Sequence, residues 1–202
     1  MSELPLMSGF PSEPSSRVTL VNWQDPPFNR WSFQHLRELI PTQRISRGTG
    51  PARPLPRHPI ALDPFAVRVD RLDGRVGTLA DVLAETWTDA VVIVHDGQIV
   101  HENYDNGMAA DTPHLLMSVT KSVVGCVAGI LAERGQLDPE LPVDAYVPEV
   151  AGSGYSGARI RDVLDMRTGV AFREEYTDPH AEVRVMERYM GWRPGLSPGD
   201  NG

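Results

Sequence analysis

The 202-residue chain is long enough for one domain of ordinary size or for part of a larger one. Its hydrophobic share of 41% and charged share of 23% are typical of a soluble globular protein. A net charge of −8 without any basic run argues against nucleic acid and against an anionic membrane surface as partners.

The sequence predicts a loosely built N-terminal region followed by a main domain. Residues 1–16 are rich in Pro and Ser and are expected to form a disordered tail. Residues 17–77 are interpreted as an aromatic wrapping segment, with a short helix near residues 32–39, and then a Pro- and Arg-rich extended connection. Residues 78–202 are predicted to hold the main domain.

Within the main domain the predicted elements are a helix, two strands, a long apolar helix and a short helix, at residues 79–87, 90–94, 98–104, 115–135 and 160–166. The two strands flank Asp96 and Gly97, and Asp-Gly between two such runs is a strong hairpin signal. Gly135 is expected to end the long helix as its C-cap.

The long helix at residues 115–135 contains the candidate site. Residues 122–132 carry no charged side chain, so this run is predicted to lie inside a core. Lys121 stands just before it and is the one lysine among nineteen basic residues. Ser118 lies three positions earlier, which on a helix brings the two side chains onto one face.

A serine beside a lysine can act as a nucleophile with its base. A lysine desolvated in an apolar setting can give up its proton at working pH, whereas arginine stays protonated. Ser118 would then attack with Lys121 accepting its proton, and the free N–H groups of the helix N-terminus would stabilise an oxyanion. The alternative is that Ser118 caps the helix while Lys121 extends to solvent.

The cysteine, histidine and N-terminal patterns bear on compartment and cofactors. Cys126 is the single cysteine, so it excludes an internal disulfide and is predicted to be a small buried side chain. The six histidines show no metal-ligand spacing, and we predict neither a metal site nor a cofactor. The N-terminus has no basic region and no sustained apolar run, so we expect no signal peptide and a cytoplasmic protein.

Several motifs in order resemble the serine β-lactamase and penicillin-binding-protein superfamily, and more narrowly the 6-aminohexanoate-dimer hydrolases of its class C β-lactamase-like branch. They span roughly Thr19 to Arg193 and read WQDPPFNRWSFQHL, HLLMSVTKS, GQLDPELPVDAYVPE, IRDVLDMRTG, EEYTDP and GWR. The resemblance implies an α/β (α+β) fold in which an antiparallel sheet packs against a helical part that carries the Ser-x-x-Lys helix.

The resemblance also implies roles for four residues. Ser118 would be the acylated nucleophile and Lys121 its general base. Tyr176 matches a tyrosine that helps hold the substrate amide in those hydrolases. Glu187 stands where they place an aspartate that favours an amine-bearing substrate, so the charge is kept with a longer reach.

Two later motifs of the superfamily are not found after residue 176: a Tyr-x-Asn and a Lys-Thr-Gly or His-x-Gly. Similar strings at residues 104–106 and 95–97 precede Ser118 and are interpreted as a strand end and a turn. We therefore interpret residues 78–202 as the N-terminal portion of a β-lactamase-like domain. We expect little turnover by this chain alone, and association, including with copies of itself, through an exposed sheet edge and an exposed apolar helix face.

The predicted function is hydrolysis of a small-molecule amide or ester through an acyl-enzyme on Ser118. One alternative is a non-catalytic remnant or binding domain of the same fold. A further alternative is a penicillin-recognising peptidase or lactamase, which the missing export signal disfavours.

Overall fold

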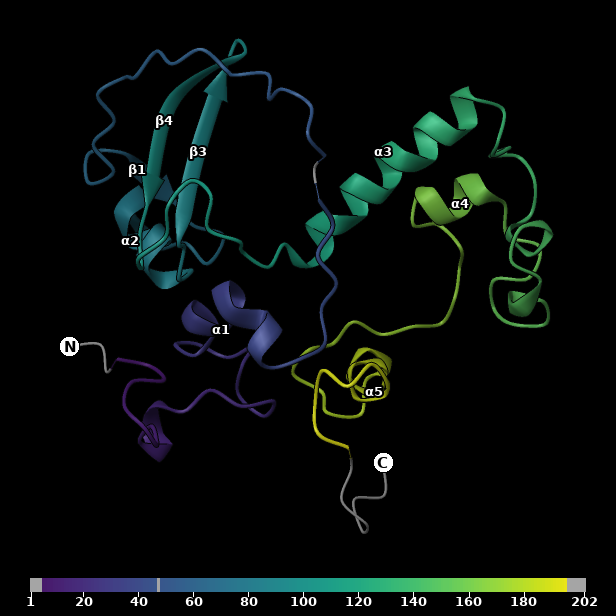
Figure 1. The fold of residues 1–202 in the computed structure, drawn as a ribbon, viewed down its shortest axis with the longest axis horizontal. Coiled ribbons are helices and arrows are strands. Elements are labelled where there is room, and N and C mark those ends of the chain that lie inside the picture. The colour runs from purple at the N-terminus through teal and green to yellow at the C-terminus, as the bar shows by residue number, and fades with distance from the viewer. Residues whose placement is uncertain (1–4, 47, 196–202) are drawn as a thin grey trace. The chain divides into compact units, whose positions relative to one another are not determined.

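The computed structural model describes residues 5–46 and 48–195 (Figure 1). The chain divides into two compact units, Met1–Leu115 and Leu116–Gly202. This boundary lies inside the predicted main domain rather than at its start. Backbone hydrogen bonds explain the difference, because Leu79 donates to Val67 and Ile99 donates to Pro56, which joins the hairpin to the segment before it.

The first unit begins with three short helical segments. They are a 3-10 turn at Pro14–Ser16, the helix α1 at Asn29–His35 and a 3-10 turn at Leu36–Glu38. Trp23 is 1% exposed, and its ring meets that of Phe33 edge-on at 6.1 Å. The described part of the predicted tail is ordered here, since Ser16 is buried and its carbonyl accepts a hydrogen bond from the Met7 N–H.

A short hairpin and a capped helix follow. Strands β1, Arg68–Asp70, and β2, Val76–Thr78, pair antiparallel, and the helix α2 runs over Leu79–Glu85. Thr78 and Asp81 form a capping box that fixes the start of α2. The sequence predicted α2 but missed β1 and β2, because strands of three residues are too short to show alternation.

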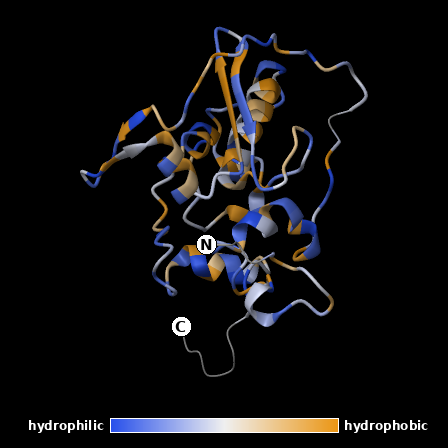
Figure 2. Cartoon of the chain, turned by 90° about the vertical axis from the view of Figure 1, so that its left-hand side faces the viewer, coloured by the Kyte–Doolittle hydropathy of each residue, from blue (hydrophilic) through white to orange (hydrophobic). Residues whose placement is uncertain are grey.

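The predicted hairpin is confirmed as strands β3, Ala90–His95, and β4, Gln98–Tyr104. Asp96 and Gly97 form its turn with φ of 47° and 73°, the positive values that a two-residue hairpin turn requires. The strings at 95–97 and 104–106 are therefore a turn and a strand end, as predicted. Figure 2 shows β3 as almost wholly hydrophobic, and Val92, Ile93 and Val94 are 37–49% exposed.

The second unit is helical in its described part. Its elements are a 3-10 turn at Met117–Val119, α3 at Thr120–Glu133, 3-10 turns at Val143–Ala145 and Pro148–Val150, α4 at Ile160–Leu164 and α5 at Glu182–Tyr189. The long helix and the short helix near residue 160 were predicted, whereas α5 was not.

The prediction that the long helix is buried is wrong. Ala128 is the one buried residue of α3, and Cys126, also predicted buried, is exposed. Val119, Val123, Val127 and Ile130 are 47–60% exposed along one side of the helix. The described residues of the second unit supply no cover for that side.

The segment between α3 and α4 is held together by backbone and charged contacts. Val143 donates to the Ala158 carbonyl at 2.7 Å, and Ile160 donates to the Leu141 carbonyl at 3.0 Å. Glu140 pairs with Arg159 at 3.1 Å and with Arg161 at 2.6 Å. These contacts hold residues 138–165 as one loop-rich layer. No helix among the described residues is long and apolar enough to cross a membrane.

Candidate active site

Ser118 and Lys121 are in direct contact. Ser118 lies in the 3-10 turn that leads into α3, and Lys121 is the second residue of the helix. The Lys121 Nζ donates a hydrogen bond to the Ser118 Oγ at 2.9 Å. The i, i+3 spacing read from the sequence therefore gives the short nucleophile-to-base distance that this chemistry requires.

The backbone just before Ser118 is strained. Met117 has a φ of 46°, in the left-handed region that a residue with a side chain rarely adopts. Such positions cost about 1–3 kcal/mol and concentrate at functional sites. This strain could not be predicted from the sequence, because glycine or asparagine is the usual mark of a positive φ.

The face of α3 that carries the pair is open. Ser118 and Lys121 are both exposed, and a side chain built at Gly125 or Gly129, on the same face, would meet nothing within 4 Å. The apolar cover predicted around Lys121 is not supplied by the described residues of the second unit. Ser118 and Lys121 therefore have the short distance that proton transfer requires, but Lys121 is not desolvated.

Tyr176 and Glu187 belong to a second cluster, which is centred on Arg184. Tyr176 precedes α5 and is 52% exposed, whereas Glu187 lies on α5 and is 4% exposed. Arg184 binds both residues, through the Tyr176 carbonyl and the Glu187 carboxylate. Arg184 was not predicted as a site residue, although its i, i+3 spacing from Glu187 indicates a contact once α5 is recognised as a helix.

A buried ion cluster in the first unit was also missed. The Asp89 side chain is 4% exposed and lies 3.1 Å from the Arg30 Nε and 3.3 Å from the His114 Nε2. The other ring nitrogen of His114 lies 2.9 Å from the Leu115 carbonyl. This cluster fixes the end of the first unit, close in sequence to Ser118.

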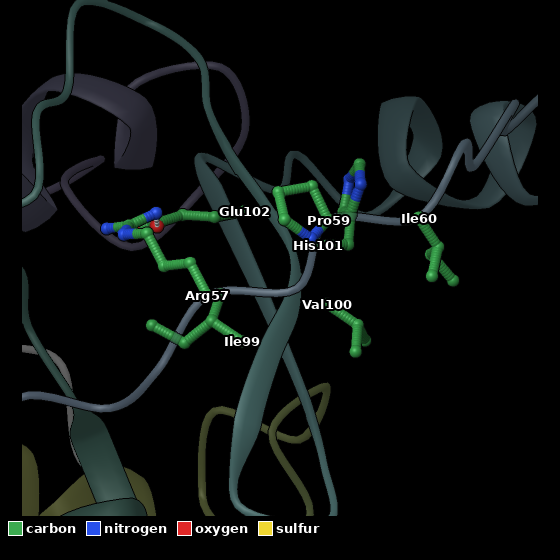
Figure 3. A pocket seen from close by; sticks show the side chains of 7 residues that line it. All are labelled: Arg57, Pro59, Ile60, Ile99, Val100, His101 and Glu102. Carbon is green, nitrogen blue, oxygen red and sulfur yellow. Dashed lines mark hydrogen bonds and ion pairs between the residues drawn. The ribbon is translucent and has the colours of Figure 1, made fainter.

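A hollow in the first unit lies beside β4 and contains none of the four predicted site residues. Figure 3 shows its lining residues, which come from two segments: Arg57, Pro59 and Ile60, and the residues Ile99 to Glu102 of β4. Arg57 forms an ion pair with Glu102. Hydrogen bonds from Tyr104 and Arg57 lower the pKa of the Glu102 carboxyl, so these polar groups already satisfy one another.

The sequence of this chain matches a known protein family and known relatives. The Beta-lactamase family model matches residues 79–201. The chain is 42% identical over 184 residues to a 6-aminohexanoate-dimer hydrolase of Paenarthrobacter ureafaciens, a match that covers 91% of this chain and 45% of that protein. It is 33% identical over 63 residues to an esterase/beta-lactamase, LipL, of Mycobacterium tuberculosis, covering 31% of this chain and 15% of the relative.

The structure also resembles a solved structure. A Bacillus anthracis protein assigned as a 6-aminohexanoate-dimer hydrolase superposes with a TM-score of 0.74 at 30% identity, over 91% of this chain and 48% of that one. The chain thus spans about half the length of the two hydrolases that it matches along most of its own length.

Proposed function

The chain belongs to the Beta-lactamase family, and from this membership we propose that it supplies the nucleophile and the general base of a serine hydrolase acting on a small-molecule amide. The observation that carries the proposal is the 2.9 Å hydrogen bond from the Lys121 Nζ to the Ser118 Oγ. The strained φ of Met117, next to the serine, supports it.

In the proposed reaction Lys121 accepts the Ser118 proton while the Oγ bonds to the amide carbon. The carbon–nitrogen bond then breaks, the amine leaves with a proton, and the acyl group stays on Ser118. Water subsequently adds to the acyl carbon, releases the acid and returns the proton to Ser118. Tyr176, with half of its surface exposed, is proposed to contact the substrate amide.

The substrate class rests on the relatives. The 42% identical relative is named for the 6-aminohexanoate dimer, which is an amide, so an amide of this kind is the first candidate. The 33% identical relative is named as an esterase, which makes an ester the second candidate.

A non-catalytic role is the rival from another class. It is favoured by the exposure of Ser118 and Lys121, because a solvated lysine is a poor base for a serine. On that reading, Ser118→Ala changes no activity of any protein that contains this chain.

The test uses a chimaera in which residues 1–195 are joined to the remaining half of the Paenarthrobacter relative. We expect hydrolysis of the 6-aminohexanoate dimer by the chimaera and a fall in kcat/KM of more than about 10⁴-fold in Ser118→Ala. Lys121→Arg keeps the positive charge but cannot accept the proton, so we expect a comparable loss. Ser122→Ala, on the same face of α3, is the matched control and should keep most of the activity.

Two results would contradict the proposal. One is a folded chimaera that retains hydrolysis after Ser118→Ala, and the other is a folded chimaera that cleaves neither the amide dimer nor a nitrophenyl ester. For the 202-residue chain alone we expect no stoichiometric reaction of Ser118 with a fluorophosphonate probe. Stoichiometric labelling would show that the described residues already form a complete site.

A further inference from the structure

A buried carboxylate holds two arginines beside Tyr176. The Glu187 side chain is 6% exposed and accepts from the Arg184 Nη1 at 2.8 Å and from the Arg193 Nε at 2.6 Å. The two guanidinium groups are themselves only 14% and 22% exposed. A carboxylate buried in this way is stable because both partners stay in place.

Arg184 connects this carboxylate to Tyr176. Its Nε donates to the Tyr176 carbonyl at 3.0 Å, and its Nη2 donates to the same oxygen. The guanidinium carbon also lies 5.2 Å from the centre of the Tyr176 ring, within the range of a cation–π contact. One planar group thus binds Glu187, the Tyr176 backbone and the Tyr176 ring, which only the rigid fork of arginine can do.

Direct contact between Glu187 and a substrate amine fits these positions poorly. The side chain is only 6% exposed and already accepts from both arginines, so contact with a substrate amine would require it to become more exposed.

We propose that Arg184 is a positioning residue for Tyr176, and that Glu187 acts on the site through Arg184, which it holds together with Arg193. This inference deepens the proposed function and rests on it for the role of Tyr176. The ring is supported from the side of α5, and its exposed surface is left for the substrate.

The test follows the Tyr176 ring by ¹⁹F NMR in the 202-residue chain labelled with 3-fluorotyrosine. The chain has five tyrosines, and Tyr176→Phe identifies the resonance. We expect Arg184→Lys and Glu187→Gln each to move the Tyr176 resonance beyond its line width and to leave the other four in place. Arg188→Lys is the matched control, because Arg188 is on the same helix and donates to the Pro179 carbonyl.

A double variant separates action through Arg184 from an independent effect of Glu187. In the Arg184→Lys background, Glu187→Gln should cause no further shift of the Tyr176 resonance. Additive shifts, or a resonance unmoved by Arg184→Lys, would overturn the inference. If Glu187→Gln does not fold, Glu187→Asp takes its place, since it keeps the charge and shortens the reach.

The outcome is distinguishable from failure of the proposed function. The NMR experiment uses neither substrate nor Ser118, so it can succeed even if the chimaera is inactive. In an active chimaera we expect Arg184→Lys to lower kcat/KM for the amide dimer by up to about 100-fold, the effect of a misplaced contact near 1 Å. Arg188→Lys should leave kcat/KM unchanged, and an equal loss in both variants would contradict a positioning role for Arg184.

Discussion

Backbone strain at Met117 lies directly beside the candidate nucleophile Ser118. The left-handed φ of 46° at Met117 turns the chain immediately before Ser118. A side chain in this conformation costs about 1–2 kcal/mol relative to glycine. The cost is retained at the position where the candidate nucleophile must be presented, which is where stored strain is usually found.

This reading predicts a difference between two small substitutions at Met117. Both Met117→Gly and Met117→Ala remove the side chain, but only glycine relieves the backbone. We expect Met117→Gly to exceed Met117→Ala in free energy of unfolding by about 1 kcal/mol, measured by urea denaturation. Equal stability of the two variants would argue that the left-handed φ carries no strain.

Ion pairs set the pH response of the layer between α3 and α4. The hydrogen bond from Arg161, with the charges of Arg161 and Arg159, holds the pKa of Glu140 below its ordinary value. Hydrogen bonds from Arg159 act in the same direction on the pKa of Asp162. A lowered folded-state pKa contributes stability that is present above the unfolded-state value and is lost as pH falls through the folded-state value.

We therefore expect the unfolding midpoint of the chain to fall as pH drops below about 4, where free Asp and Glu begin to protonate. Glu140→Gln should reduce this fall, because it removes one of the titrating groups. Glu133→Gln, at an exposed position on α3, is the control for the loss of one negative charge outside this layer. The measurement is the urea midpoint followed by circular dichroism between pH 7 and pH 3. A flat profile for the unmodified chain would contradict the prediction.

The elements that the sequence predicted are those with local signals. The β3–β4 hairpin follows from Asp96-Gly97, and Ser118 meets Lys121 because helical spacing alone brings them together. What failed depended on partners distant in sequence. The burial of α3 was inferred from its apolar composition, which reports a preference for cover but not whether this chain provides it. Arg184 was missed because its role depends on the Tyr176 carbonyl, eight residues earlier, and on Glu187, which it binds together with Arg193.

At the scale of the whole molecule, uncovered apolar surface is the main feature. The side of α3 that carries Val123 and Val127 is more than half exposed at both residues, and β3 is hydrophobic on both faces. Contiguous apolar patches of this kind mark interaction surfaces or cause association.

We predict that the 22.3 kDa chain self-associates at micromolar concentration, measured by size-exclusion chromatography with light scattering. The double variant Val123→Gln, Val127→Gln places polar side chains one helical turn apart and should shift the chain towards monomer, since glutamine also favours helix. Thr86→Ser, at an exposed site beyond α2, is the control and should not change the mass. A monodisperse monomer of the unmodified chain would contradict the prediction.

Cys126 is a reactive group by which exposure of the apolar side of α3 can be measured. It is exposed, it is the one thiol of the chain, and it lies between Val123 and Val127 on the helix that begins just after Ser118. Any polypeptide that settles on this side must also shield the sulfur from a small thiol reagent. The rate at which Cys126 is alkylated therefore measures the fraction of molecules whose nucleophile helix is covered, without substrate and without turnover.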